Sequence, residues 1–231
     1  MLRELIQAWR GKDLLSRMLV EFQDMLARTE WMFGAVSDVL LRKRKPAELQ
    51  EEIYRTDKDV NEAERRIRRQ IVEHLSVRPD ADVPAALVLM SIVKDAERVG
   101  DYCKNIFEVA CMYTMDMNHG RYIGPFQETR SRIAELFVRV RNAFARSDEA
   151  EARQVIADAE TLAGWCDDRI NDFFHDTLTT QQAVAYTLLA RYFKRIASHL
   201  KNVASAIVST VEELDYPMGP QHKRKQGKAP E

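Results

Sequence analysis

The chain has 231 residues, of which 45% are hydrophobic and 31% charged, and it contains only 8 glycines and 7 prolines. A chain of this length can bury a substantial core without disulfides or metals, and its composition favours long amphipathic helices over sheets. Its 35 basic and 36 acidic residues leave a formal net charge of −1, which argues against a dedicated nucleic-acid binder.

The cysteines Cys103, Cys111 and Cys166 are odd in number, and no pair has the CxxC spacing of a zinc site. All three fall in apolar helical patterns, so we expect buried thiols. The first residues lack the continuous apolar run of a signal peptide, and no run of about 18 apolar residues predicts a membrane span. We therefore expect a cytoplasmic protein.

Helical periodicity predicts six main helices after an amphipathic lead-in over residues 1–12. The six helices are expected at about residues 13–41, 47–76, 83–115, 126–146, 148–175 and 180–214. Gly and Pro punctuation between Asn118 and Pro125 marks a boundary between two units, residues 13–117 and 123–215. The polar segment 216–231 is expected to be disordered. The sequence thus predicts an all-α fold of two tandem three-helix bundles with six long antiparallel helices.

Two landmarks recur in the same order in both units. Residues 97–106 and 194–203 share an Arg, a β-branched residue, a small residue and a Lys-Asn pair, at an offset of 97 residues (202 minus 105). Residues 57–62 match residues 167–172 at an offset of 110 (167 minus 57). A duplicated three-helix unit accounts for both, and chance similarity between amphipathic helices is the alternative.

The first unit carries acidic residues at helical spacing. Glu97 and Asp101 are one turn apart on the third helix, and Asp57 and Asn61 have the same spacing on the second. Antiparallel packing of these helices would bring three carboxylates and one amide to one groove. Hard oxygen ligands of this kind suit a metal ion, although acidic pairs at this spacing are also common on solvated helices.

The stretch SIVKDAERVGDYCKNIFEVA, residues 91–110, resembles the third-helix motif of the PhoU family. The family's acidic pair corresponds to Glu97 and Asp101 and is followed by its Asn at Asn105, while residues 57–61 are similar to its second-helix pattern. The six-helix plan extends the likeness to about residues 14–214. The resemblance implies a cytoplasmic negative regulator of phosphate uptake that binds metal, as iron, zinc or another ion, and has no catalytic activity. It also implies a phosphate ABC transporter and a sensor histidine kinase as partners.

The second unit departs from this motif. Its acidic pair is replaced by Lys194 and Ser198, while Asp167 and Asn171 remain. A protonated lysine cannot ligate a metal, so we expect at most a degenerate second site of Asp167, Asn171 and His199. A lone helical His is more often satisfied at a packing edge. We also hypothesise that Lys194 pairs with Asp167, so that its ammonium group takes the place of a metal cation.

Other functions are weakly supported. No Gly-rich phosphate loop, nucleophile elbow or HExxH motif occurs, so no catalytic residue is predicted. The alternatives are a metal-independent helical adaptor of a membrane transporter and, less favoured, a metal-dependent helical-bundle enzyme. The sequence does not choose among iron, zinc, manganese and magnesium. Peripheral membrane contact and a homodimer are both compatible with it.

Overall fold

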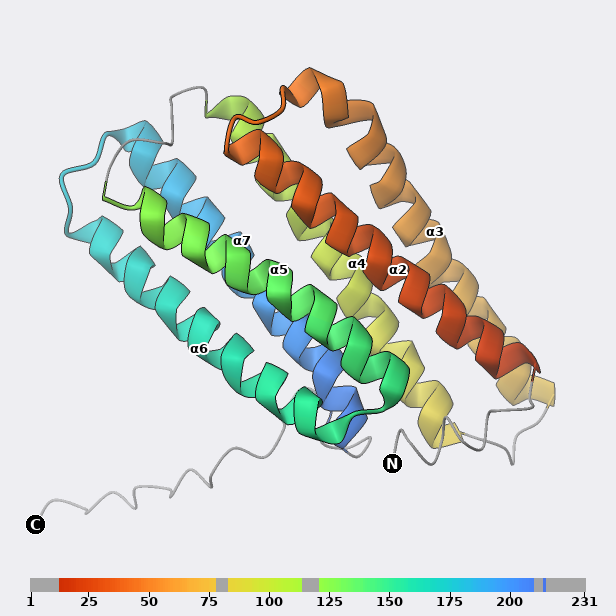
Figure 1. Ribbon diagram of the computed structural model, residues 1–231. Coiled ribbons are helices and arrows are strands. Elements are labelled where there is room, and N and C mark those ends of the chain that lie inside the picture. The colour runs from red at the N-terminus through yellow and green to blue at the C-terminus, as the bar shows by residue number, and fades with distance from the viewer. Residues whose placement is uncertain (1–12, 78–82, 114–120, 210–213, 215–231) are drawn as a thin grey trace, which may run out of the picture.

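The computed structural model describes residues 13–77, 83–113, 121–209 and 214, and its regular elements are all α-helices (Figure 1). In chain order they are α2 (Asp13–Leu40), α3 (Pro46–Val77), α4 (Val83–Met112), α5 (Ile123–Arg146), α6 (Glu149–Phe174) and α7 (Thr180–Val208). The predicted all-α fold is confirmed. The expected lead-in over residues 1–12 and the expected disorder of residues 216–231 lie outside the described residues.

The helix ends follow from local chemistry. Asp148 caps α6 by accepting a hydrogen bond from the backbone N–H of Glu151. Thr179 caps α7 within a capping box, in which its side chain and that of Gln182 bond to each other's backbone N–H. Pro46 opens α3, because the first turn of a helix leaves its backbone N–H groups unpaired in any case.

Three predicted boundaries were wrong by three residues or more, and one of them is the end of α4, which lies at Met112 and not at residue 115. Helix α5 begins at Ile123 and not at residue 126, because Gly124 and Pro125 fit inside the first turn, where a missing N–H costs no helical hydrogen bond. Helix α7 ends at Val208 and not at residue 214, with Ser209 in an extended conformation at the cap.

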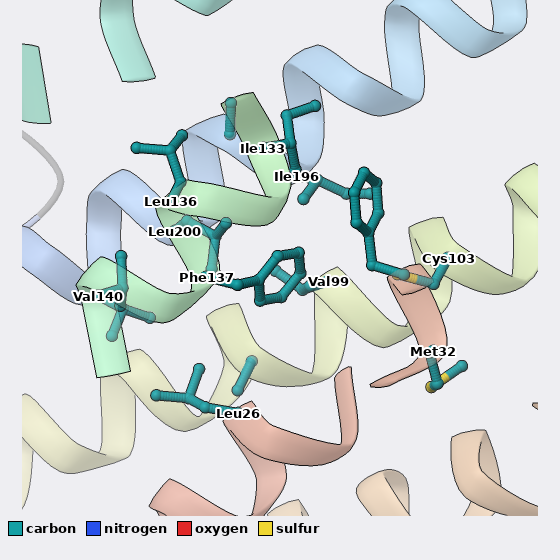
Figure 2. Packing of buried hydrophobic residues seen from close by; sticks show 14 of the residues in the cluster. Leu26, Met32, Val99, Cys103, Ile133, Leu136, Phe137, Val140, Ile196 and Leu200 are labelled. Carbon is teal, nitrogen blue, oxygen red and sulfur yellow. The ribbon is translucent and has the colours of Figure 1, made fainter. Parts of the chain in front are cut away.

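The helices pack as two three-helix bundles, α2–α4 and α5–α7, joined mainly through α4 against α7 and α2 against α5 (Figure 1). Figure 2 shows apolar side chains from these four helices meeting in one core, including Leu26, Val99, Phe137 and Leu200. Phe33 of α2 stands 5.4 Å, centroid to centroid, from Phe137 of α5. The seam between the bundles is therefore a continuation of the hydrophobic core.

Two surface properties bear on function. Of the helices described, none is long and apolar enough to cross a membrane. Cys103 and Cys166 are buried as expected, but Cys111 is exposed, which corrects the prediction of three buried thiols. Cys111 lies in the last turn of α4 on the exposed side of the helix, whereas Val109 and Ala110 of the same turn are buried.

Candidate functional site

The predicted acidic residues of the first unit lie along the contact between α3 and α4. Asp57 of α3 is 8% exposed, in keeping with its register among the apolar residues of that helix. The Lys104 ammonium donates a hydrogen bond of 2.9 Å to Asp57 Oδ2, and it lies 3.4 Å from Asp101 Oδ1. One lysine of α4 therefore joins an α3 carboxylate to an α4 carboxylate.

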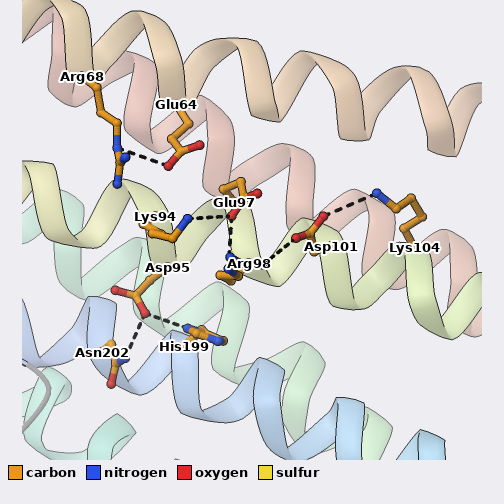
Figure 3. Close-up of polar contacts among 10 residues, drawn as sticks. All are labelled: Glu64, Arg68, Lys94, Asp95, Glu97, Arg98, Asp101, Lys104, His199 and Asn202. Carbon is orange, nitrogen blue, oxygen red and sulfur yellow. Dashed lines mark hydrogen bonds and ion pairs between the residues drawn. The ribbon is translucent and has the colours of Figure 1, made fainter.

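Asp101 is held on both of its oxygens. Lys104 contacts Oδ1, and Arg98 Nη1 donates to Oδ2 at 3.1 Å (Figure 3). Burial works against the charged form of Lys104, but hydrogen bonding and attraction from Asp57 and Asp101 outweigh it, so the pKa of the ammonium lies above its usual value. Lys104 is therefore a protonated counter-ion at neutral pH.

Glu97 lies one turn from Asp101 and is less well compensated. Its side chain is 13% exposed, and its nearest cations are Arg98 Nε at 3.6 Å and Lys94 Nζ at 3.9 Å from Oε2. Burial raises the pKa of Glu97, and the negative charges of Asp101 and of Glu64 on α3 raise it further, while Arg98 and Lys94 offset this in part. Glu97 is therefore a carboxylate whose ionised form lacks adequate partners.

Several oxygens of this contact accept no hydrogen bond. Among the buried oxygens without a hydrogen bond are Glu97 Oε2, Asn61 Oδ1 and Glu64 Oε1. Glu64 Oε1 does form an ion pair, with Arg68 Nε at 3.2 Å. Buried oxygens without a donor are uncommon in folded proteins and invite a cation. The residues thus fit a hard metal ion chemically. In the conformation described, however, no three His, Cys, Asp or Glu side chains of residues 13–77, 83–113 and 121–209 are grouped closely enough to hold one.

The three residues of the expected second site do not come together. Lys194 Nζ contacts Asp167 Oδ2 at 2.5 Å, which is the ion pair hypothesised from the sequence. The Asn171 side chain is exposed, and the backbone carbonyl of this residue lies 2.9 Å from His175 Nδ1. His199 lies elsewhere, on the side of α7 that faces α4.

His199 belongs to a polar contact across the seam between the bundles. Its Nδ1 lies 2.7 Å from Oδ1 of buried Asp95, which also accepts a 2.9 Å hydrogen bond from Asn202 Nδ2 (Figure 3). The imidazole stacks on Tyr102, with ring centroids 5.6 Å apart. His199 therefore has its polar partner within the α4–α7 contact. This agrees with the alternative given from the sequence, a helical His at a packing edge and not a metal ligand.

Three residues of this region were not assigned a role from the sequence. Lys104 and Glu64 each lie three residues from a predicted ligand, Asp101 and Asn61 respectively, so helical spacing was a signal for both. Asp95 carried no such signal, because its partners are more than a hundred residues away.

Comparison with known proteins gives relatives of one kind. Residues 22–110 match the family model of the PhoU domain. The chain is 24% identical over 200 residues to the phosphate-specific transport system accessory protein PhoU homolog of Deinococcus radiodurans, a match that covers 80% of this chain and 88% of that protein.

Solved structures share the fold. The crystal structure of PhoU from Pseudomonas aeruginosa superimposes with a TM-score of 0.77 at 19% identity, covering 85% of this chain and 96% of that one. The phosphate transport system regulatory protein PhoU from Streptococcus pneumoniae has a TM-score of 0.68 at 16% identity, covering 84% and 95%. The resemblance to the PhoU family is therefore confirmed, by the match of residues 22–110 to the PhoU domain model and by a fold shared with PhoU structures over most of the chain.

Proposed function

We propose that this protein is a PhoU-like accessory protein of phosphate transport that damps phosphate-starvation signalling. The observation that carries the proposal is the likeness to a phosphate-specific transport system accessory protein over 80% of the chain, together with the shared fold. By the same resemblance, its partners are a phosphate ABC transporter and a sensor histidine kinase, met at the cytoplasmic face of the membrane. We assign it no catalytic step.

We further propose that the α3–α4 contact binds a metal ion as part of this regulation. Glu97, Asp101, Asp57 and Asn61 would supply the oxygens, and the proposal is supported by the buried Glu97 Oε2 and Asn61 Oδ1, which accept no hydrogen bond. A bound cation would contribute positive charge between two helices of the first bundle and so stiffen that contact. The ligand chemistry fits magnesium, manganese or iron and does not choose among them.

The metal-independent adaptor is the second candidate, and one observation favours it. Asp57 and Asp101 share Lys104, and Asp167 is paired with Lys194, so lysine side chains neutralise carboxylates in both units. In that case the acidic face is structural, and regulation depends on docking alone.

Elemental analysis separates the two candidates. Protein purified without a chelator or an affinity tag should contain stoichiometric metal, and Glu97→Ala/Asp101→Ala should lose it. Glu51→Ala/Glu73→Ala, which removes two exposed carboxylates from α3, is the matched control and should keep the metal. Metal-free wild-type protein that also resists titration with iron, zinc and manganese would leave the adaptor as the better account.

A genetic test addresses the regulatory role itself. Deleting the gene should activate a phosphate-starvation reporter in phosphate-rich medium, and the wild-type gene should restore repression. Restoration by Glu97→Ala/Asp101→Ala as well would assign regulation to the adaptor. An unchanged reporter in the deletion strain would argue against the phosphate role.

A further inference from the structure

The two ends of the α3–α4 contact differ in how their charges are compensated. At one end, Asp57 and Asp101 share Lys104, whose side chain is 23% exposed. At the other end, Glu97 Oε2 accepts no hydrogen bond and has only ion pairs of 3.6 and 3.9 Å. Asp57 and Asp101, which could ligate one metal ion from two different helices, are therefore already joined by an ammonium.

We infer that Lys104 is a built-in competitor for the metal site: its ammonium lies between Asp57 and Asp101, and a cation bound by both carboxylates must displace it. This inference rests on the proposed metal site. An ammonium and a metal ion cannot occupy the same space between two carboxylates, and they would also repel each other there. Metal binding is therefore coupled to a movement of one lysine side chain.

A second carboxylate is placed to receive the displaced lysine. Glu108 lies four residues beyond Lys104 on α4, so the two side chains project from the same helical face one turn apart. Among the contacts of the described residues, Glu108 accepts a 3.3 Å hydrogen bond from the hydroxyl of Tyr54 on α3. Lys104 thus has two alternative sets of partners, Asp57 with Asp101 when the site is free of metal, and Glu108 when metal is bound.

The competition between Lys104 and the metal ion sets the metal concentration at which the site becomes occupied. Breaking charge-assisted hydrogen bonds to two carboxylates weakens the apparent affinity for metal by about ten- to a hundredfold relative to a site without the lysine. The site would remain in its lysine-bound state at low metal concentration and change state only when the free ion becomes abundant. The second unit, where Lys194 contacts Asp167 and an acidic pair is lacking, would stay permanently lysine-bound.

Calorimetric titration of chelator-treated full-length protein with Mn²⁺ tests this inference. Lys104→Met removes the ammonium and adds no metal ligand, so its Kd should be at least about tenfold lower than that of the wild type. Lys104→Arg, which keeps the charge, should bind as weakly as the wild type. Lys94→Met is the matched control: it removes a lysine from the same helix near Glu97 but leaves the Asp57–Lys104–Asp101 contact intact.

The outcomes separate the inference from the proposed function. Equal or weaker Mn²⁺ binding by folded Lys104→Met would overturn the competition and leave the metal site standing. If wild type and variant both fail to bind at millimolar Mn²⁺, the metal site and the competition both fall. Lys104→Leu, which likewise adds no metal ligand, is the second variant should Lys104→Met not fold, with circular dichroism as the check, and the same tenfold gain is expected.

Discussion

Asp95 and His199 lie 104 residues apart, and a 2.7 Å contact between Asp95 Oδ1 and His199 Nδ1 joins their two bundles. An ionised carboxylate can only accept, so Nδ1 carries the proton and donates. With the repeat offset of 97 residues, position 192 of the second unit is equivalent to Asp95, and position 199 is equivalent to Tyr102. Tyr102 and Tyr192, with ring centroids 5.9 Å apart, therefore occupy the reciprocal position. Reciprocal contacts are what two related units packed about a pseudo-two-fold axis would produce.

The seam contact should contribute measurably to stability. Asp95→Ala leaves His199 and Asn202 without their acceptor at a buried position, so we expect the free energy of unfolding to fall by about 1–3 kcal/mol. Asp95→Asn, whose amide oxygen can still accept, should lose less. Urea unfolding monitored by circular dichroism measures both. Asp168→Ala, an exposed position of α6, is the control and should change little; an equally stable Asp95→Ala would show that the contact is dispensable.

Glu97 should make stability depend on pH in a defined direction. The pKa of Glu97 is raised in the folded protein, so as pH falls the folded state protonates this carboxylate at a higher pH than the unfolded state does. Ionised Glu97 therefore lowers the free energy of unfolding near neutral pH. Metal-free Glu97→Gln should therefore be more stable than the wild type at pH 7–8. The advantage should shrink as pH falls through the raised pKa toward the ordinary value of 4.5.

Urea midpoints of both proteins at four pH values, with chelator present, measure this difference. Glu62→Gln, at an exposed site of α3, is the matched control for replacing a glutamate of the first bundle by glutamine. A pH-independent difference between Glu97→Gln and the wild type would contradict the role given to burial.

Replacing Gly100 by alanine should be tolerated and should increase the stability of the protein. A Cβ at this position would stand 3.6 Å from Thr29 Cγ2 and 3.7 Å from Val60 Cγ1, which is ordinary contact. Glycine inside a helix is less favourable than alanine by about 0.5–1 kcal/mol, so Gly100→Ala should raise the unfolding free energy by about that amount. The position 97 residues later already holds a buried alanine, Ala197. A lower melting temperature for Gly100→Ala would mean that this contact is tighter than the distances imply.

The three thiols should differ sharply in reactivity. Burial raises the pKa of Cys103, and it raises the pKa of Cys166 to about 12, so neither forms the reactive thiolate in the folded protein. A disulfide reagent such as DTNB should label one thiol per chain in the native state and three in denaturant. Cys111→Ser should abolish the native labelling, whereas native labelling that persists in this variant would place an accessible thiol elsewhere.

The sequence by itself determined the fold class, because helical periodicity, caps and Pro positions are local signals. Pro46, Asp148 and Thr179 act on backbone groups within a few residues of themselves, so these helix ends depend on local sequence alone. The position of Asp57 on the buried side of α3 followed from its register with apolar neighbours. The start of α5 was predicted wrongly because a Gly-Pro pair is compatible both with a loop and with the first turn of a helix, and the sequence does not distinguish the two.

Only the tertiary structure decided which partners Asp57, Asp101 and His199 have. Spacing placed Asp57 and Asp101 on their helices, but the rotation of α3 against α4 put Lys104 between them. Likewise, no local pattern connects His199 with Asp95, since that contact exists only where the two bundles meet. Side-chain charges interact over a few ångströms, and packing determines which residues from distant parts of the chain come within that distance.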